Sequence, residues 1–363
     1  MKKTIMISLL IIVVINIAFF TRLWGAEAVS KDTESFIKNF MTNENETLAT
    51  YIKNAEHLDS DEVRGREALS ESLGLWMLYS VEKGDHSIFK EAYRVLESNF
   101  LTDDGFIFWK LAENGEAEVD TDALVDNLRI TEALFKAEEQ WNEKKYGETA
   151  SRIGEYMKDY FGTAHIWTDF YDRRHHQTSD ILTYSYIDVE ALTLLKDHQL
   201  IPLSTFQGMT SLLTKAELQK GFYPKSIHAD SNKVSYNNEV NMIDQVLVAL
   251  NQAKLGNSSS EFTAFVTEEM DAKGKLYGRY SLQTKEPTVD YESPALYGFL
   301  ILYAMELDDK KLALQAYNRM TDFRETRFKF KGGYAVSNGD THIFDNLVPL
   351  LAEETLKKAG WLP

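Results

Sequence analysis

The chain has 363 residues and a formal net charge of −17, with 39 Lys and Arg against 56 Asp and Glu. Cations that meet phosphates dominate binding to nucleic acids and to anionic lipid, so this balance argues against both as partners of the protein as a whole. The complete lack of cysteine excludes disulfide scaffolds, thiolate metal sites and thiol nucleophiles.

The first 28 residues have the pattern of a targeting segment. Lys2 and Lys3 precede an apolar run over residues 5–20, and Ala26-Glu27-Ala28 matches the small-x-small motif that signal peptidases accept. A signal peptide cut after Ala28 is the favoured interpretation, and an uncleaved membrane anchor through the apolar run is the alternative. Because no cysteine follows the run, there is no site for a lipid-modified N-terminus. Both interpretations place residues 29–363 outside the cytoplasmic membrane of a bacterium, either secreted or anchored at its outer face.

The remainder of the chain predicts helices. Apolar residues recur at i, i+3, i+4 and i+7 over residues 130–137, 243–250 and 296–303, which is the spacing of one helix face. Turn residues separate such stretches, as in Lys83-Gly84-Asp85 and Asp271-Ala272-Lys273-Gly274. With no linker or shift in composition, we expect one domain, monomeric, over residues 29–363.

The number of helices predicts how they are arranged. About a dozen helical segments would form six helical hairpins, which suits an all-α fold closed into an (α/α)6 barrel. An open solenoid of helix pairs also fits that number, but solenoids show sequence repeats and none is found here.

The informative carboxylates are those that lie among aromatic and small residues. Glu71 opens a predicted helix, where a first-turn Glu is ordinarily explained by the helix dipole. Asp126 and Asn127 lie inside an amphipathic pattern, where a solvated pair is less natural, and Asp244 adjoins an apolar helix face. A buried carboxylate is costly unless it is hydrogen-bonded or functional. The histidines form no metal-binding motif, and no nucleophile elbow or phosphate-binding loop occurs, so the candidate site consists of carboxylates and aromatics.

Read in order, these segments resemble glycoside hydrolase family 8, a family of inverting endo-glucanases, chitosanases and xylanases with an (α/α)6 barrel. That family carries Ser-Glu-Gly-x-x-Tyr-Gly-Met, in which the Glu is the general acid. Residues 70–77 keep its Ser, Glu and Met, but Ser72 and Trp76 replace the two glycines and Leu75 replaces the Tyr.

Weaker matches follow over about residues 65–350. The acidic pair that opens the next helix is shifted here, and one member is Asn127. The family's Tyr-Asp-Ala-x-Arg helix keeps its Asp as Asp244, but its Arg is Leu247. The other matched segments are a Trp-containing loop at 106–110, the pair Ser185-Tyr186 and a Gly-Phe-x-Pro loop at 221–224.

The resemblance implies an inverting glycosidase with two carboxyl groups about 6.5–9.5 Å apart, one protonated and one ionised. Glu71 is then the acid. The base is either Asp244 or Asp230, because some branches of the family carry the base in a loop like the one after residues 221–224. Asp126 with Asn127 would hold the sugar, and neither a metal nor an organic cofactor is expected. The further residues expected to line the groove are Trp76, Trp109, Tyr184, Tyr186, Arg279 and Tyr280.

The expected function is that of an exported endo-glycosidase that cleaves a bacterial exopolysaccharide, because the divergence resembles relatives associated with exopolysaccharide synthesis. The departures at Asn127 and Leu247 keep open a non-catalytic polysaccharide-binding or synthesis-accessory protein on the same fold. A polysaccharide lyase is a third possibility. A Glu71→Gln variant separates the first two, since a binding protein has no need of a carboxylate at that position.

Overall fold

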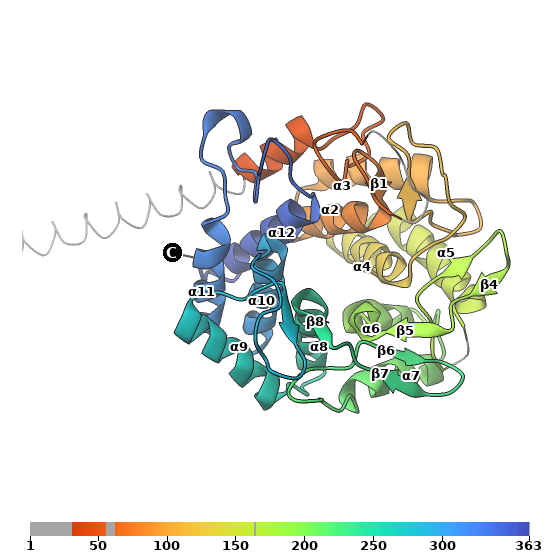
Figure 1. Cartoon of the computed structure of the whole chain (residues 1–363). Helices are drawn as coiled ribbons and strands as arrows, with labels where there is room; N and C mark the ends of the chain where they lie inside the picture. The colour runs from red at the N-terminus through yellow and green to blue at the C-terminus, as the bar shows by residue number, and fades with distance from the viewer. Residues whose placement is uncertain (1–30, 56–61, 163–164, 363) are drawn as a thin grey trace, which may run out of the picture.

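The computed structural model describes residues 31–55, 62–162 and 165–362. The predicted signal or anchor segment, residues 1–28 with its cleavage site after Ala28, lies outside these ranges. Within them, the helices form two concentric layers, seen end-on in Figure 1.

Six helices form the inner layer. Each packs against the next along the chain, α2 on α4, α4 on α6, α6 on α8, α8 on α10 and α10 on α12, and the contact of α12 with α2 closes the ring. The prediction of an all-α (α/α)6 barrel is confirmed, and ring closure rules out the open solenoid. The inner helices are α2 (Ser70–Lys83), α4 (Leu124–Trp141), α6 (Val189–Asp197), α8 (Met242–Lys254), α10 (Pro294–Glu306) and α12 (Phe344–Lys358).

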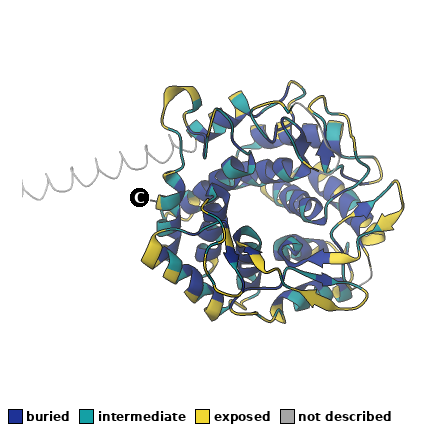
Figure 2. Cartoon of the chain, viewed as in Figure 1, coloured by how far each residue is buried: buried dark blue, intermediate teal, exposed yellow. Residues whose placement is uncertain are grey.

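The outer helices cover this ring. Residues 31–40 are also helical, and Glu34 in that stretch accepts hydrogen bonds from Tyr79 and Lys83 of α2. Figure 2 shows exposed residues concentrated on the outer faces, while the inner helices are largely buried. The labelled outer helices are α3 (His86–Val95), α5 (Lys144–Tyr160), α7 (Leu203–Thr214), α9 (Ser260–Lys273) and α11 (Lys310–Thr321).

Local sequence explains where several helices begin and end. The side chains of Asp85, Asp188 and Asn241 accept backbone N–H groups at the starts of α3, α6 and α8. Gly84 and Gly274 end α2 and α9 in the left-handed conformation, with φ of 73° and 67°. Both turns expected at these glycines are therefore confirmed.

Short antiparallel strands join the helices. The central group is the three-stranded sheet β5-β6-β7, which precedes α6 and α8 in the chain. A π-helical turn η1 (Leu96–Phe100) and two 3-10 turns, η2 (Tyr184–Tyr186) and η3 (Phe328–Phe330), complete the connections. The strand pairs are β1 (Ala68–Leu69) with β2 (Lys110–Leu111), β3 (Tyr171–Asp172) with β4 (Gln177–Thr178), β5 (Ile181–Thr183) with β6 (Ser226–His228), β6 with β7 (Lys233–Ser235), and β8 (Glu239–Asn241) with β9 (Arg279–Ser281).

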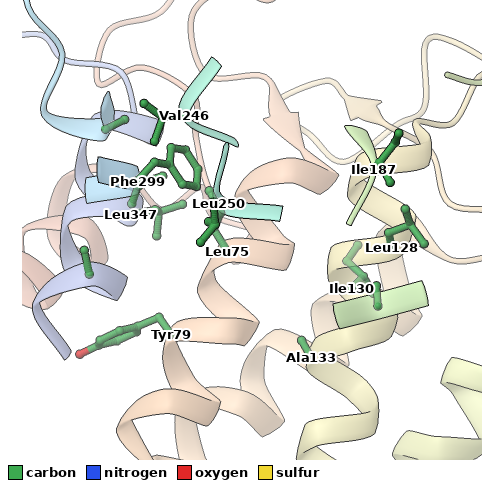
Figure 3. Close-up of a cluster of buried hydrophobic side chains, with 14 of the residues drawn as sticks. Leu75, Tyr79, Leu128, Ile130, Ala133, Ile187, Val246, Leu250, Phe299 and Leu347 are labelled. Carbon is green, nitrogen blue, oxygen red and sulfur yellow. The ribbon is translucent and has the colours of Figure 1, made fainter. Parts of the chain in front are cut away.

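Apolar side chains fill the barrel between the inner helices. Leu75, Leu128, Val246, Phe299 and Leu347, from five different inner helices, belong to the same buried cluster (Figure 3). This region is therefore packed core and not an open channel.

The N-termini of the inner helices meet at one end of the barrel. Ser70 of α2 bonds to a carboxylate in the first turn of α4, Ser185 just before α6 bonds to one in α8, and Asp345 of α12 accepts the backbone N–H of Ala295 in α10. The positive ends of the helix dipoles therefore converge where the predicted carboxylates lie.

Candidate active site

Glu71 occupies the first turn of α2, beside the start of α4. Burial raises the pKa of its carboxyl group to about 7, and the negative charge of Asp126 adds to the rise, whereas the guanidinium of Arg129 opposes it. A carboxyl group with this pKa is still partly protonated at neutral pH, as a general acid has to be. The prediction that Glu71 opens a helix is confirmed.

Asp126 is the buried neighbour of Glu71. Its Oδ2 accepts a hydrogen bond of 2.7 Å from the Ser70 hydroxyl, its Oδ1 accepts one of 3.2 Å from Arg129, and the backbone N–H of Glu71 also donates to it. Burial raises the pKa of Asp126 as well, but all three donors favour its ionised form. The two groups therefore differ in environment, because Asp126 has hydroxyl and guanidinium donors that stabilise its charged form.

Asp244 lies across the end of the barrel, in the first turn of α8. Its Oδ1 accepts a hydrogen bond of 2.8 Å from the Ser185 hydroxyl, and its Oδ2 lies 2.7 Å from Nζ of Lys225. Its side chain is 21% exposed, so water can reach it. An ammonium and a hydroxyl donor on one carboxylate form the environment of a charged base and not of an acid.

Asp169 is a third carboxylate at this end. It accepts the backbone N–H and the hydroxyl of Thr183 at 2.6 and 2.8 Å. Burial raises its pKa, the negative charge of Asp244 contributes to the rise, and the ammonium of Lys225 opposes it. Asp169 therefore adjoins the ion pair formed by Lys225 and Asp244.

Tyr186 links these groups. It ends the 3-10 turn η2, and burial raises the pKa of its hydroxyl, with further contributions from the negative charges of Asp169, Asp126, Asp244 and Glu71. The neighbouring Ser185 donates a hydrogen bond to Asp244, and Tyr186 and Asp169 line the same cavity. The tertiary structure thus gathers side chains from α2, α4, α8 and the loops before α6 at one site.

A cavity of about 670 Å³ adjoins this cluster. Its aromatic lining is Trp109, Phe170 and Tyr186, and Phe170 is 41% exposed. The basic side chains at its edge are already paired, Arg174 with Asp120 and His175 with Asp172. Its size and its aromatic faces suit sugar rings, whose apolar C–H faces stack on such side chains. The other acidic lining residues are Glu118, Asp122 and Asp169, and burial raises the pKa of the last two.

Five residues expected to contact the sugar are buried instead. Trp76 is 6% exposed and stacks on Tyr79. Tyr280 and Asn127 are fully buried, Tyr184 is 3% exposed and Asp126 is 4% exposed. The expectation of direct sugar contact is corrected for these five, because a match to a family motif does not show whether a side chain faces the core or the cleft.

Asp230 and Arg279 are both exposed, Asp230 in a turn and Arg279 in a strand. Asp230 is exposed in the turn that joins β6 to β7, at the opposite end of β6 from Lys225. Arg279 is 46% exposed in β9 and forms an ion pair with Glu239 of β8 at 2.5 Å. The cluster around Tyr186 brings together Glu71 and Asp244, but it does not include Asp230.

The site also contains residues that sequence reasoning missed. Asp169 stands in Trp-Thr-Asp-Phe, residues 167–170, a carboxylate between aromatics that the search for such settings could have found. Lys225 directly follows the Gly-Phe-x-Pro segment, and Arg129 stands at i+3 from Asp126 on one helix face. Their roles depend on contacts between distant segments.

Comparisons with known proteins agree with this architecture. The model of the family "Glycosyl hydrolases family 8" matches residues 14–165. A protein named "Putative lipoprotein YdaJ" from Bacillus subtilis (strain 168) is 38% identical over 291 residues, which cover 79% of each chain.

Two solved structures superpose on most of the chain. PssZ from Listeria monocytogenes is 28% identical with a TM-score of 0.74, and 90% of this chain and 95% of that chain are covered. A novel alpha-amylase from Clostridium perfringens has a TM-score of 0.80 at 23% identity over 90% of this chain and 97% of that one, which shows a shared fold. Together with the family match and the identity to YdaJ, these findings show that the chain belongs to glycosyl hydrolase family 8 and is a glycosidase.

Proposed function

We propose that this glycosidase is exported and cleaves a bacterial exopolysaccharide within the polymer, with inversion at the anomeric carbon. The observation that carries the mechanism is that Glu71 and Asp244 lie in the first turns of α2 and α8, two inner helices on opposite sides of the ring. An inverting enzyme needs an acid and a base on opposite faces of the sugar, about 6.5–9.5 Å apart.

In the proposed reaction, Glu71 donates its proton to the glycosidic oxygen as the bond to the leaving sugar breaks. Asp244 takes a proton from the water that attacks the anomeric carbon on the other face, and the two groups return to their starting states by exchange with solvent. Lys225 and Ser185 hold Asp244 as the charged base. Asp126 raises the pKa of the acid and holds the first turn of α2 through Ser70.

Asp244 is proposed as the base in preference to Asp230. Asp244 lies in the first turn of α8, and its negative charge contributes to the raised pKa of both Asp169 and Tyr186. Asp230, in an exposed turn, lacks the burial and donors that fix a catalytic group.

The charge of the cavity bears on the class of sugar. Its acidic lining residues outnumber the basic ones, and Arg174 and His175 are already paired with Asp120 and Asp172. A polymer of uronic acids would bring further negative charge into that cavity, which costs free energy. The proposed substrate is therefore an exopolysaccharide of neutral or amino sugars.

Export is supported by the pattern of residues 1–28 and by the name of YdaJ, which calls that relative a lipoprotein. This chain has no cysteine to acylate, so its attachment would use the apolar run over residues 5–20. Within residues 31–55, 62–162 and 165–362, no helix is both long and apolar enough to span a bilayer.

The test is hydrolysis of a panel of purified exopolysaccharides, with cellulose, xylan, chitosan and soluble starch for comparison. Proton NMR of the first products should show the anomeric configuration opposite to that of the cleaved bond. Retained configuration would refute inversion, and an unsaturated sugar end that absorbs ultraviolet light would indicate a lyase. Faster cleavage of a plant polymer, or of a polyuronate, would refute the proposed substrate while leaving the mechanism standing.

A further inference from the structure

The loop between α11 and α12 presents one phenylalanine completely to solvent. Phe328 is 99% exposed, whereas the other large apolar side chains counted as exposed in the described part of the chain reach at most 57%. Phe330, two residues on, packs against Phe36 and Phe40 and thereby fixes the loop to the body of the protein. The exposure of Phe328 is therefore a property of a fastened turn, η3, and not of a loose end.

Cations surround this phenylalanine. Arg327, Lys329 and Lys331 are all exposed, in a protein whose net charge is −17. Glu325 pairs with Arg327, and Lys331 pairs with Asp32 at 2.7 Å, so neighbouring carboxylates balance part of the positive charge of the loop. The outer edge of the loop combines an apolar ring with positive charge. That combination is typical of segments that insert at the interface of an anionic bilayer.

The loop is also fastened beside the start of the described chain. The hydroxyl of Thr33 donates to the carbonyl of Gly332 at 2.8 Å, and the ion pair between Lys331 and Asp32 lies next to it. Only the eleven residues from 21 to 31 separate this point from the apolar run that ends at Phe20. Eleven residues span at most about 40 Å even when fully extended. A membrane that holds the apolar run is therefore within reach of the loop.

We infer that residues 327–331, called here the basic loop, dock on the outer surface of an anionic phospholipid bilayer. Phe328 enters the interface, and Arg327 and Lys329 face the lipid phosphates. The inference rests on the proposed export with the apolar run kept as a membrane anchor, and not on the proposed mechanism. A protein with a net charge of −17 can still bind an anionic membrane through this loop, because the loop itself is rich in basic residues.

The experiment uses the absence of cysteine, which makes any introduced cysteine unique. Phe328→Cys is labelled with an environment-sensitive fluorophore in the protein isolated from cells with its own N-terminus. The control is Leu203→Cys at the start of α7, which is 57% exposed on the opposite side of the barrel from α12 (Figure 1). Vesicles of phosphatidylglycerol with phosphatidylcholine, and of phosphatidylcholine alone, are then added.

With the phosphatidylglycerol vesicles, the label at position 328 should shift to shorter wavelength and be quenched by nitroxide lipids, and the label at position 203 should not. Arg327→Glu with Lys329→Glu should weaken this response at least tenfold. An unchanged label at position 328 would overturn the inference, as would equal responses to both lipid mixtures. A response to polysaccharide and none to vesicles would also overturn it, and would make Phe328 a sugar platform. Glycosidase activity of the same samples shows that they are folded and tests the proposed function separately.

Discussion

Replacing Glu71 with Gln should inactivate the enzyme and, at the same time, stabilise its fold at neutral and alkaline pH. The folded-state pKa of Glu71 is about 7, against an ordinary value of 4.5. Because the folded state binds this proton more tightly than the unfolded state, its contribution to stability is complete below pH 4.5. That contribution is lost as the pH rises to about 7. The pKa difference corresponds to about 3 kcal/mol in the free energy of unfolding.

Gln cannot ionise, so the Glu71→Gln variant escapes this loss. Its melting temperature at pH 8 should exceed that of the wild type by about 3–6 °C, and the difference should vanish near pH 4.5. Loss of the general acid should lower kcat by about 10²–10⁴-fold. Thermal unfolding between pH 4 and 9 and release of reducing ends measure the two effects on the same samples.

Glu353→Gln is the matched control. Glu353 in α12 is also a buried carboxyl group whose pKa burial raises to about 7, but it bonds to Tyr334 and Arg324 and lies outside the candidate site. This variant should change the pH dependence of stability and leave kcat within about twofold. If Glu71→Gln kept more than a tenth of wild-type activity, or if its melting temperature followed the wild-type pH curve, the assignment of the acid would be refuted.

Three further predictions concern the same site. Arg129→Met removes the charge that lowers the pKa of Glu71, so the alkaline limb of the plot of kcat/KM against pH should move to higher pH; a shift to lower pH would contradict the electrostatics. Asp244→Asn should lower kcat by about 10²–10⁴-fold, and Asp230→Asn should leave it within about twofold, in assays of reducing-end release; the reverse order would make Asp230 the base. Phe170→Ala should raise KM several-fold with little change in kcat, because its exposed ring lines the cavity and carries no reacting group; an unchanged KM would exclude it from substrate binding.

The sequence by itself determined the fold class and the position of Glu71 at the start of a helix. Apolar spacing of i, i+3, i+4 and i+7 fixes which face of a helix is buried, and the number of such helices, with no linker, favoured a closed barrel. The same spacing placed Asp126 on a buried face, and the structure confirms its burial. These features are local, because they depend on residues within a few turns of one another.

Tertiary structure decided which inward side chains reach a site. The resemblance predicts that Trp76 and Tyr280 line the groove, but both side chains are buried and belong to the core. The pairing of Asp244 with Lys225, 19 residues earlier, depends on how the loop that carries Lys225 returns to the start of α8. Asp169 joins them through Thr183, from yet another loop. Periodicity describes one helix at a time, whereas the pKa of a carboxylate depends on charges and donors that several distant segments bring together.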